Sequence, residues 1–199
     1  MGFRVSSYKK GSFAVGPVQH LPHLPDSMKS AVKLFEDHFR ASGLKAFDAE
    51  DHSGTWRQVT VRTNLSDQVM VIVIAHPQKM TEQELEQVKA NLIDLGQKNG
   101  SLISSLYFQA LGAKKSGEDP PVEHLSGSTH LQEKLCGLNF SVSPLAFFQV
   151  YNSLLSFSIF IFSHLYINTH TSWHFSCINV RSTRLLLKHC TVKLGISLK

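Results

Sequence analysis

Two stretches of the chain carry apolar residues at helical spacing. The first runs from residue 26 to about residue 41, and its apolar stripe consists of Met28, Val32, Phe35 and Phe39. Their intervals of four, three and four place these side chains on one face of an α-helix. Asp26 can cap the start of this helix, and Gly43 can end it.

The second helix is predicted over residues 81–97. Thr81 and Glu84 have the spacing of a capping box, in which each side chain accepts a hydrogen bond from a backbone N–H at the start of the helix. The apolar stripe consists of Leu85, Val88, Leu92 and Leu95. Asn99 and Gly100 follow, and we expect them to end the helix.

Period-two patterning predicts a β-hairpin between the two helices. In residues 56–63 the alternating faces are Trp56, Gln58, Thr60 and Arg62 on one side and Arg57, Val59 and Val61 on the other. The apolar run 68–75 is predicted as the partner strand, and residues 64–67 as the turn.

Shorter patterns complete the predicted fold. Further strands are predicted over residues 3–6, 12–15, 102–109, 122–125, 131–135 and 138–142. Ser143 and Pro144 then open a helical turn that leads to Gln149. Two amphipathic helices and many short strands predict an α+β domain, with a mostly antiparallel sheet covered by the two helices.

The charge distribution divides the chain near residue 149. Residues 1–149 hold all fifteen acidic residues and an equal number of Lys and Arg, whereas residues 150–199 hold five bases and no acid. We therefore predict a central domain over 1–149 and an unrelated apolar and basic tail over 150–199. We expect the tail to be poorly ordered, with few long-range contacts after about residue 152.

The tail contains an apolar run at residues 154–167. This run is shorter than the roughly 20 residues that a membrane-spanning helix needs. Its uncharged, proline-free and β-prone composition is typical of an aggregation segment. We therefore expect no stable membrane insertion.

Spacing alone indicates no active site. Neither GxGxxG nor GxxxxGK[ST] occurs, so no nucleotide-phosphate loop is encoded. His170, His174 and Cys177 have a passable zinc spacing, but without paired knuckles around them we expect no metal site. Cys136 has no base near it in the sequence and is expected to be a small apolar residue. We assign no catalytic residue.

Two arginines in the strand at 56–63 are candidate nucleic-acid contacts. Arg57 and Arg62 lie on opposite faces of a regular strand, so only one of them can easily point into a groove. Structural roles and RNA contacts are equally compatible with their positions. Zero net charge over residues 1–149 argues against strong RNA affinity, because phosphate contacts dominate that affinity.

One segment is far more specific. Residues 133–149, EKLCGLNFSVSPLAFFQ, resemble the RNA (uracil-5-)-methyltransferase family, in which a Leu-Gly-Leu turn and a strand precede Ser-Pro-x-Ala-Phe-Phe-Gln. Segments at residues 2–4, 56–63, 76–79 and 106–108 resemble the animal branch of that family. The likeness runs from residue 2 to residue 149.

The resemblance implies a chemistry and a cofactor. Enzymes of this family flip a uridine out of tRNA or rRNA, add a cysteine thiolate to the ring and methylate C5 from S-adenosyl-L-methionine. The final glutamine of the motif contacts the cofactor, so the resemblance implies that role for Gln149. An amide suits the role because it both donates and accepts hydrogen bonds.

After Gln149 the family pattern stops. The family's Cys-Gly-x-Gly loop, Asp-Pro-Pro-Arg motif and Ser-Cys-Asn-Pro nucleophile have no counterpart, and Cys177 stands in Phe-Ser-Cys-Ile-Asn. We therefore expect a fragment or truncated isoform that is inactive by itself. Two alternatives stay open, namely a non-catalytic module that binds RNA or protein, and a small membrane-associated protein that uses residues 154–167.

The cellular location is an expectation only. Within the animal branch the likeness is to the mitochondrial homologue, which implies a mitochondrial address for the longer relative. The chain shows no secretory signal, and its three cysteines are unpatterned. Without a mitochondrial address we therefore expect a cytoplasmic, reducing environment and no secretion.

Overall fold

The computed structural model describes residues 1–4, 15–22, 24–48, 51–77, 80–112, 120–135, 138–146 and 192–195. The early elements are β1 (Gly2–Arg4), β2 (Val15–Pro17), α1 (Asp26–Ala41), β3 (Trp56–Thr63), β4 (Val69–Ala75) and α2 (Glu82–Lys98). They are followed by β5 (Ser105–Ala110), β6 (Glu123–Gly127), β7 (Leu131–Leu135), β8 (Leu138–Val142) and β9 (Val192–Gly195).

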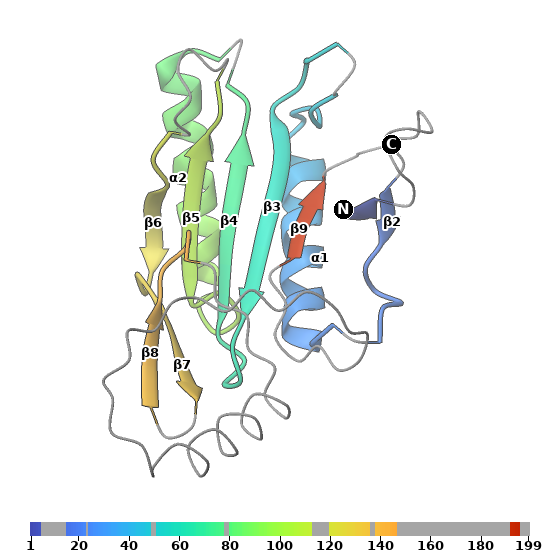
Figure 1. Ribbon diagram of the computed structural model, residues 1–199. Helices are drawn as coiled ribbons and strands as arrows, with labels where there is room; N and C mark the ends of the chain where they lie inside the picture. The colour runs from blue at the N-terminus through green and yellow to red at the C-terminus, as the bar shows by residue number, and fades with distance from the viewer. Residues whose placement is uncertain are drawn as a thin grey trace, which may run out of the picture.

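Seven strands form one sheet in the order β2-β1-β9-β3-β4-β5-β6, and β7 pairs only with β8 within the described residues. Neighbouring strands are antiparallel except β4 and β5, which are parallel and connected through α2 (Figure 1). The predicted α+β class with a mostly antiparallel sheet is confirmed.

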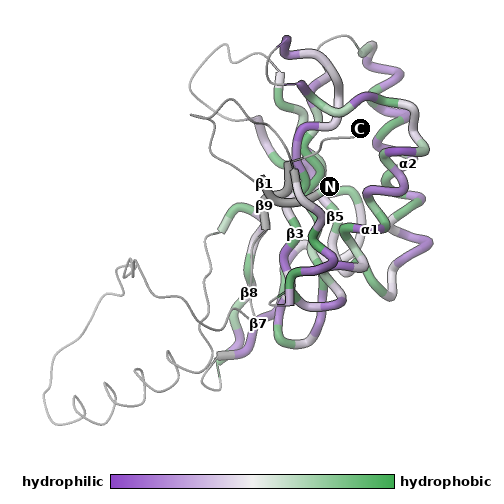
Figure 2. Tube along the Cα trace, turned by 90° about the vertical axis from the view of Figure 1, so that its right-hand side faces the viewer, coloured by the Kyte–Doolittle hydropathy of each residue, from purple (hydrophilic) through white to green (hydrophobic). Residues whose placement is uncertain are grey.

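Both helices pack on the same face of the sheet, and the β7–β8 hairpin lies on the other side (Figure 2). The main core fills the space between helices and sheet. From α1 it takes the predicted stripe of Met28, Val32, Phe35 and Phe39, all buried. From α2 it takes Val88 and Leu92, with Leu85 and Leu95 partly buried against it.

The predicted N-terminal cap is confirmed for α2 and is wrong for α1. Thr81 and Glu84 form both bonds of the predicted capping box. The predicted cap at Asp26 is wrong, because Pro25 occupies the N-cap position and no side chain caps α1. Asp26 lies in the first helical turn, where its carboxylate contacts the Lys29 ammonium at 3.4 Å and faces the positive end of the helix.

Strand β3 departs from the predicted alternation. Its pairing with β4 shifts register between Trp56 and Gln58, which marks a β-bulge. Because a bulge inserts one residue, the side chains before it change face. Trp56 therefore joins Val59 and Val61 in the core beneath the helices, with its ring centroid 4.2 Å from that of Phe39.

The other strands follow the prediction with shifts of a few residues. The pair β1–β2 overlaps the predicted strands at 3–6 and 12–15, of which residues 5–14 lie outside the described residues. Strand β5 begins three residues later than predicted. Strands β7 and β8 have their predicted bounds. The turn between β3 and β4 is closed by the Asn64 Oδ1, which accepts from the backbone N–H groups of Ser66 and Gln68.

Strand β9 was not predicted. It lies between β1 and β3 and pairs antiparallel with β3 from Gln58↔Gly195 to Val61↔Val192. The expectation of few long-range contacts after residue 152 is therefore wrong for these four residues. The proposed boundary at 149/150 and the apolar run 154–167 lie outside the described residues, so both stay predictions.

Candidate functional site

The segment that leads towards Gln149 leaves the sheet through the β7–β8 hairpin. Five residue pairs join the two strands, from Leu131↔Val142 to Leu135↔Leu138. A turn follows, in which the backbone N–H of Ala146 donates to the carbonyl of Ser143 at 3.2 Å. Gln149 itself lies outside the described residues, together with Phe147, Phe148 and all three cysteines.

Three side chains of the main sheet hold this hairpin by its backbone. The Arg62 Nη1 donates to the carbonyl of Ser143 at 3.1 Å. The Asn64 Nδ2 donates to the carbonyl of Gln132 at 2.7 Å. The Tyr107 hydroxyl donates to the carbonyl of Thr129 at 2.6 Å. The hairpin is thus attached at its start, in β7 and at its exit.

A small apolar cluster lies between the hairpin and the sheet. Its buried members are Met70, Ile72, Tyr107, Leu131 and Val142, and Ala146 packs against them. The turn after β8 is therefore held by a charged hydrogen bond on one side and by apolar contact on the other. Leu145, between them, is 71% exposed.

The guanidinium of Arg62 is engaged inside the fold. The side chain is half-buried, and this burial lowers the pKa of the group. It stays a cation, because an arginine does not deprotonate in proteins. Its buried Nε has no hydrogen-bond partner among the described residues. Its RNA contact stays a prediction, but the structure places its Nη1 on the Ser143 carbonyl.

Arg57 lies in different surroundings at the other end of β3. It is exposed, and its Cζ lies 5.0 Å from the ring centroid of Phe47. Within the described part of the chain it forms no ion pair. The rings of Phe47 and His76 meet edge-on at 5.0 Å. Arg57 and Arg62 thus lie in different surroundings. Because the bulge falls at Arg57, their predicted placement on opposite faces of a regular strand stays a prediction.

The loop beside Arg57 is closely folded and carries both signs of charge. The Asp51 carboxylate accepts from the backbone N–H and the hydroxyl of Ser53, and these bonds lower its pKa. Burial lowers the pKa of His76, and the charges of Arg57 and His52 lower it further. The loop acids reduce the positive potential that Arg57 offers to a phosphate.

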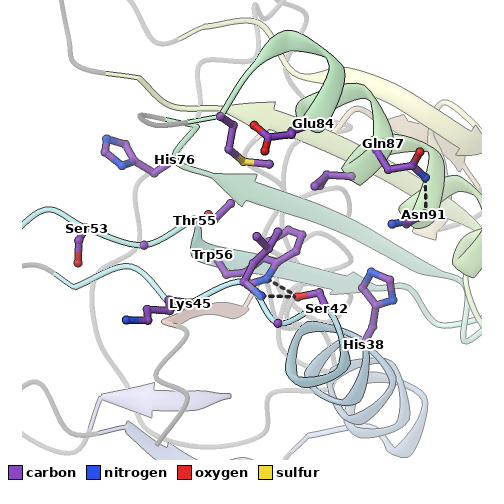
Figure 3. Close-up of a pocket in the computed structure, with 15 residues that line it drawn as sticks. His38, Ser42, Lys45, Ser53, Thr55, Trp56, His76, Glu84, Gln87 and Asn91 are labelled. Atoms are coloured by element: carbon purple, nitrogen blue, oxygen red, sulfur yellow. Dashed lines mark hydrogen bonds between the residues drawn. The ribbon is translucent and has the colours of Figure 1, made fainter.

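A cavity of about 560 Å³ lies on the helical face, between the end of α1 and the first turns of α2 (Figure 3). Trp56 lines it, and the indole N–H donates to the Ser42 hydroxyl at 3.1 Å. Polar lining residues include His38, Lys45, Glu84, Gln87 and Asn91. Burial lowers the pKa of His38. No sequence pattern indicates this cavity, because its walls come from segments far apart in the chain.

Neither this cavity nor a second one, at Lys89, Phe108 and Pro120, includes a residue of the turn that leads to Gln149. No group of three or more potential metal ligands occurs in the part of the chain that the structure describes. None of the helices described there is long and apolar enough to cross a membrane.

Comparison with curated proteins identifies the relatives of the chain. The tRNA (uracil-5-)-methyltransferase homolog A of Mus musculus is 40% identical over 155 residues, and its Homo sapiens counterpart is 39% identical. The homolog B of Danio rerio is 35% identical over 154 residues. Each match covers 75% of this chain, but only 25%, 25% and 32% of the relative. No protein-family model matches.

One solved structure supports the fold. The Pyrococcus abyssi tRNA (uracil-54, C5)-methyltransferase, in complex with S-adenosyl-L-homocysteine, superposes with a TM-score of 0.51 at 15% identity. The match covers 69% of this chain and 31% of that one. By sequence similarity the chain belongs to the RNA (uracil-5-)-methyltransferase family, and it spans between a quarter and a third of the length of these relatives.

Proposed function

We propose that this chain is the central domain of an S-adenosyl-L-methionine-dependent RNA uracil-5-methyltransferase and that it does not methylate RNA by itself. The observation that carries the proposal is the similarity over 155 residues to tRNA (uracil-5-)-methyltransferase homologues. The domain's role would be to hold the segment that ends in Gln149. A mitochondrial location for the longer relative stays a prediction.

The chemistry explains why the domain alone would be inactive. Uracil C5 becomes nucleophilic when a thiolate adds at C6, so the reaction needs a placed cysteine and a base. Neither Cys136 nor Cys177 has a base arranged beside it by the sequence. S-adenosyl-L-methionine would supply the methyl group. Leu145 in the Ser143–Ala146 turn is exposed, and neither of the two cavities described above includes a residue of this turn.

The affinity for the cofactor can be bounded. Gln149 would offer a neutral hydrogen bond or two, each contributing about 0.5–1.5 kcal/mol. Association costs at least about 4 kcal/mol of translational and rotational freedom. We therefore expect no binding of S-adenosyl-L-methionine at micromolar concentration.

The test uses the purified 199-residue chain. Isothermal titration with S-adenosyl-L-methionine should show no heat of binding, and tritiated methyl groups should not be transferred to undermodified tRNA. Cofactor-dependent methylation that disappears in Cys177→Ala would show that the chain is an active enzyme.

A second function, an RNA-binding module without catalysis, is favoured by one observation. Arg57 is exposed, is held by the Phe47 ring and has no carboxylate partner among the described residues. An arginine held in this way can direct its remaining N–H donors to a phosphate. The acidic residues Asp48 and Asp51 in the neighbouring loop limit the affinity to be expected.

A further inference from the structure

We propose that Arg62 is a positioning residue for the segment leading into Gln149, and not an RNA contact. The proposal rests on the proposed function for the role of Gln149. The attachment that it describes is a property of this fold and can be measured without cofactor or RNA.

The hairpin depends on side chains for its orientation. In the described residues β7 and β8 pair only with each other, so no strand pairing fixes the hairpin to the main sheet. Apolar packing in a cluster of five buried residues is non-directional. The three hydrogen bonds from Arg62, Asn64 and Tyr107 are directional contacts, and they join the backbone of the hairpin to residues of the sheet and of the β3–β4 turn.

Among these three, Arg62 alone holds the exit. Tyr107 binds Thr129, before β7, and Asn64 binds Gln132, within β7. Arg62 binds Ser143, the first residue after β8 and six residues before Gln149. Loss of this bond would remove a directional contact from the exit turn and leave the apolar packing of Val142 and Ala146 beside it.

The burial of Arg62 also fits an internal role. Burying a cation costs free energy, and here one buried donor, Nε, has no partner among the described residues. A side chain whose role was to meet phosphate would keep its fork in solvent, as Arg57 does. Arginine suits the position because its planar group reaches a fixed carbonyl with a charge-assisted bond.

The experiment measures amide hydrogen exchange by mass spectrometry on the full chain. In Arg62→Met, peptides covering residues 139–146 should exchange at least about tenfold faster, since a hydrogen bond to a charged group is lost. Peptides covering β4 should keep their rates. Arg62→Lys, which retains the charge but not the planar fork, should give an intermediate increase.

Arg57→Met is the matched control, because it removes the same side chain from the same strand. It should leave exchange in residues 139–146 unchanged. The affinity for a fluorescein-labelled tRNA stem-loop at low salt is the second readout, and Arg62→Met should not alter it by fluorescence anisotropy.

Two results would overturn the proposal. One is weaker RNA binding by Arg62→Met with unchanged exchange, which would make Arg62 an RNA contact. The other is equal acceleration in β4 and in residues 139–146, which would make it a general structural residue. If Arg62→Met does not fold, Arg62→Lys decides, since no local acceleration in that variant also overturns the proposal. Methylation by this chain would instead overturn the proposed function.

Discussion

Gly54 shows at the residue scale how closely the loop before β3 is folded. Its φ is +87°, and a Cβ built there would lie 2.1 Å from the carbonyl oxygen of Ala46. Backbone hydrogen bonds from Thr55 to Lys45 and from Phe47 to Trp56 bring the two sides of the loop together. This loop carries Phe47 to Arg57 and lines the cavity around Trp56.

Gly54→Ala should therefore lower the free energy of unfolding by about 3 kcal/mol or more, because the new methyl group meets backbone that has no room to move. Gly43→Ala is the matched control. Its φ is +70°, but nothing lies within 4 Å of its built Cβ, so only the backbone strain of about 1 kcal/mol is expected. Urea denaturation measures the free energy of unfolding of both variants. Equal decreases would contradict a close contact between residue 54 and the Ala46 carbonyl.

Arg62 and Asn64 each donate a hydrogen bond to a residue far away in the sequence. Both belong to a strand and a turn that local pattern predicts. The residues to which they bind, Ser143 and Gln132, cannot be predicted in this way. The bond from Arg62 to Ser143 spans 81 residues, and that from Asn64 to Gln132 spans 68. Such contacts depend on where the hairpin packs, which periodicity does not encode.

At the scale of single elements, α1 links the core to the cavity. One side of the helix is buried through its apolar stripe, while His38 on a neighbouring position lines the cavity (Figure 3). Its half-buried ring is harder to protonate than an exposed imidazole, because charge is costly to desolvate. The folded chain therefore binds a proton at His38 more weakly than the unfolded chain does.

This difference predicts a pH dependence of stability. The unfolded histidine, with a pKa near 6.5, takes up its proton first as the pH falls. The free energy of unfolding should therefore fall between pH 7 and pH 5, and His76, whose pKa is also lowered, should add to the effect. Against the effect of burial, hydrogen bonds from the N-terminal ammonium and Arg40 lower the pKa of Glu36, and hydrogen bonds from Thr81 lower the pKa of Glu84, so these carboxyl groups act at lower pH.

Urea unfolding at pH 5, 6 and 7 checks this expectation. His38→Gln should flatten the dependence, because it removes one of the titrating groups. Ser30→Gln, at an exposed position on the same helix, should keep the wild-type slope. An unchanged slope in His38→Gln would show that the ring is solvated in the folded chain.

At the scale of the whole molecule, β9 connects two parts of the sheet. It pairs with β1 on one side and with β3 on the other. Without these four residues the β3 edge would expose unpaired N–H and C=O groups, which invite pairing with other chains. The last segment of the chain therefore completes the sheet that the first 146 residues build (Figure 1).

A chain cut after Gln149 should therefore lose protection along β3. Amides of Gln58–Val61 that face β9 should exchange faster by mass spectrometry, whereas β4 and β5, which lie further inside the sheet, should keep their rates. A second chain, cut after Val192, loses most of β9 but keeps residues 150–192. Its β3 amides should exchange as fast as those of the chain cut after Gln149, if the loss of β9 is the cause. Unchanged exchange in β3 would show that β9 adds no stability.

Local sequence patterns predict both helices, the capping box, the β3–β4 turn and the bounds of β7 and β8 correctly. These features arise from hydrogen bonds and burial within a few residues, so local periodicity and turn chemistry suffice to predict them. The family, too, was identified from the residues before Gln149.

The remaining features depend on contacts between distant segments. The bulge that turns Trp56 into the core, the parallel pairing of β4 with β5, the place of β9 and the attachment of the hairpin through Arg62 each join segments distant in the chain. Their energies depend on which surfaces meet after the elements have formed. A pattern of polar and apolar residues specifies which face of an element is buried. It does not specify which residues of other elements pack against that face.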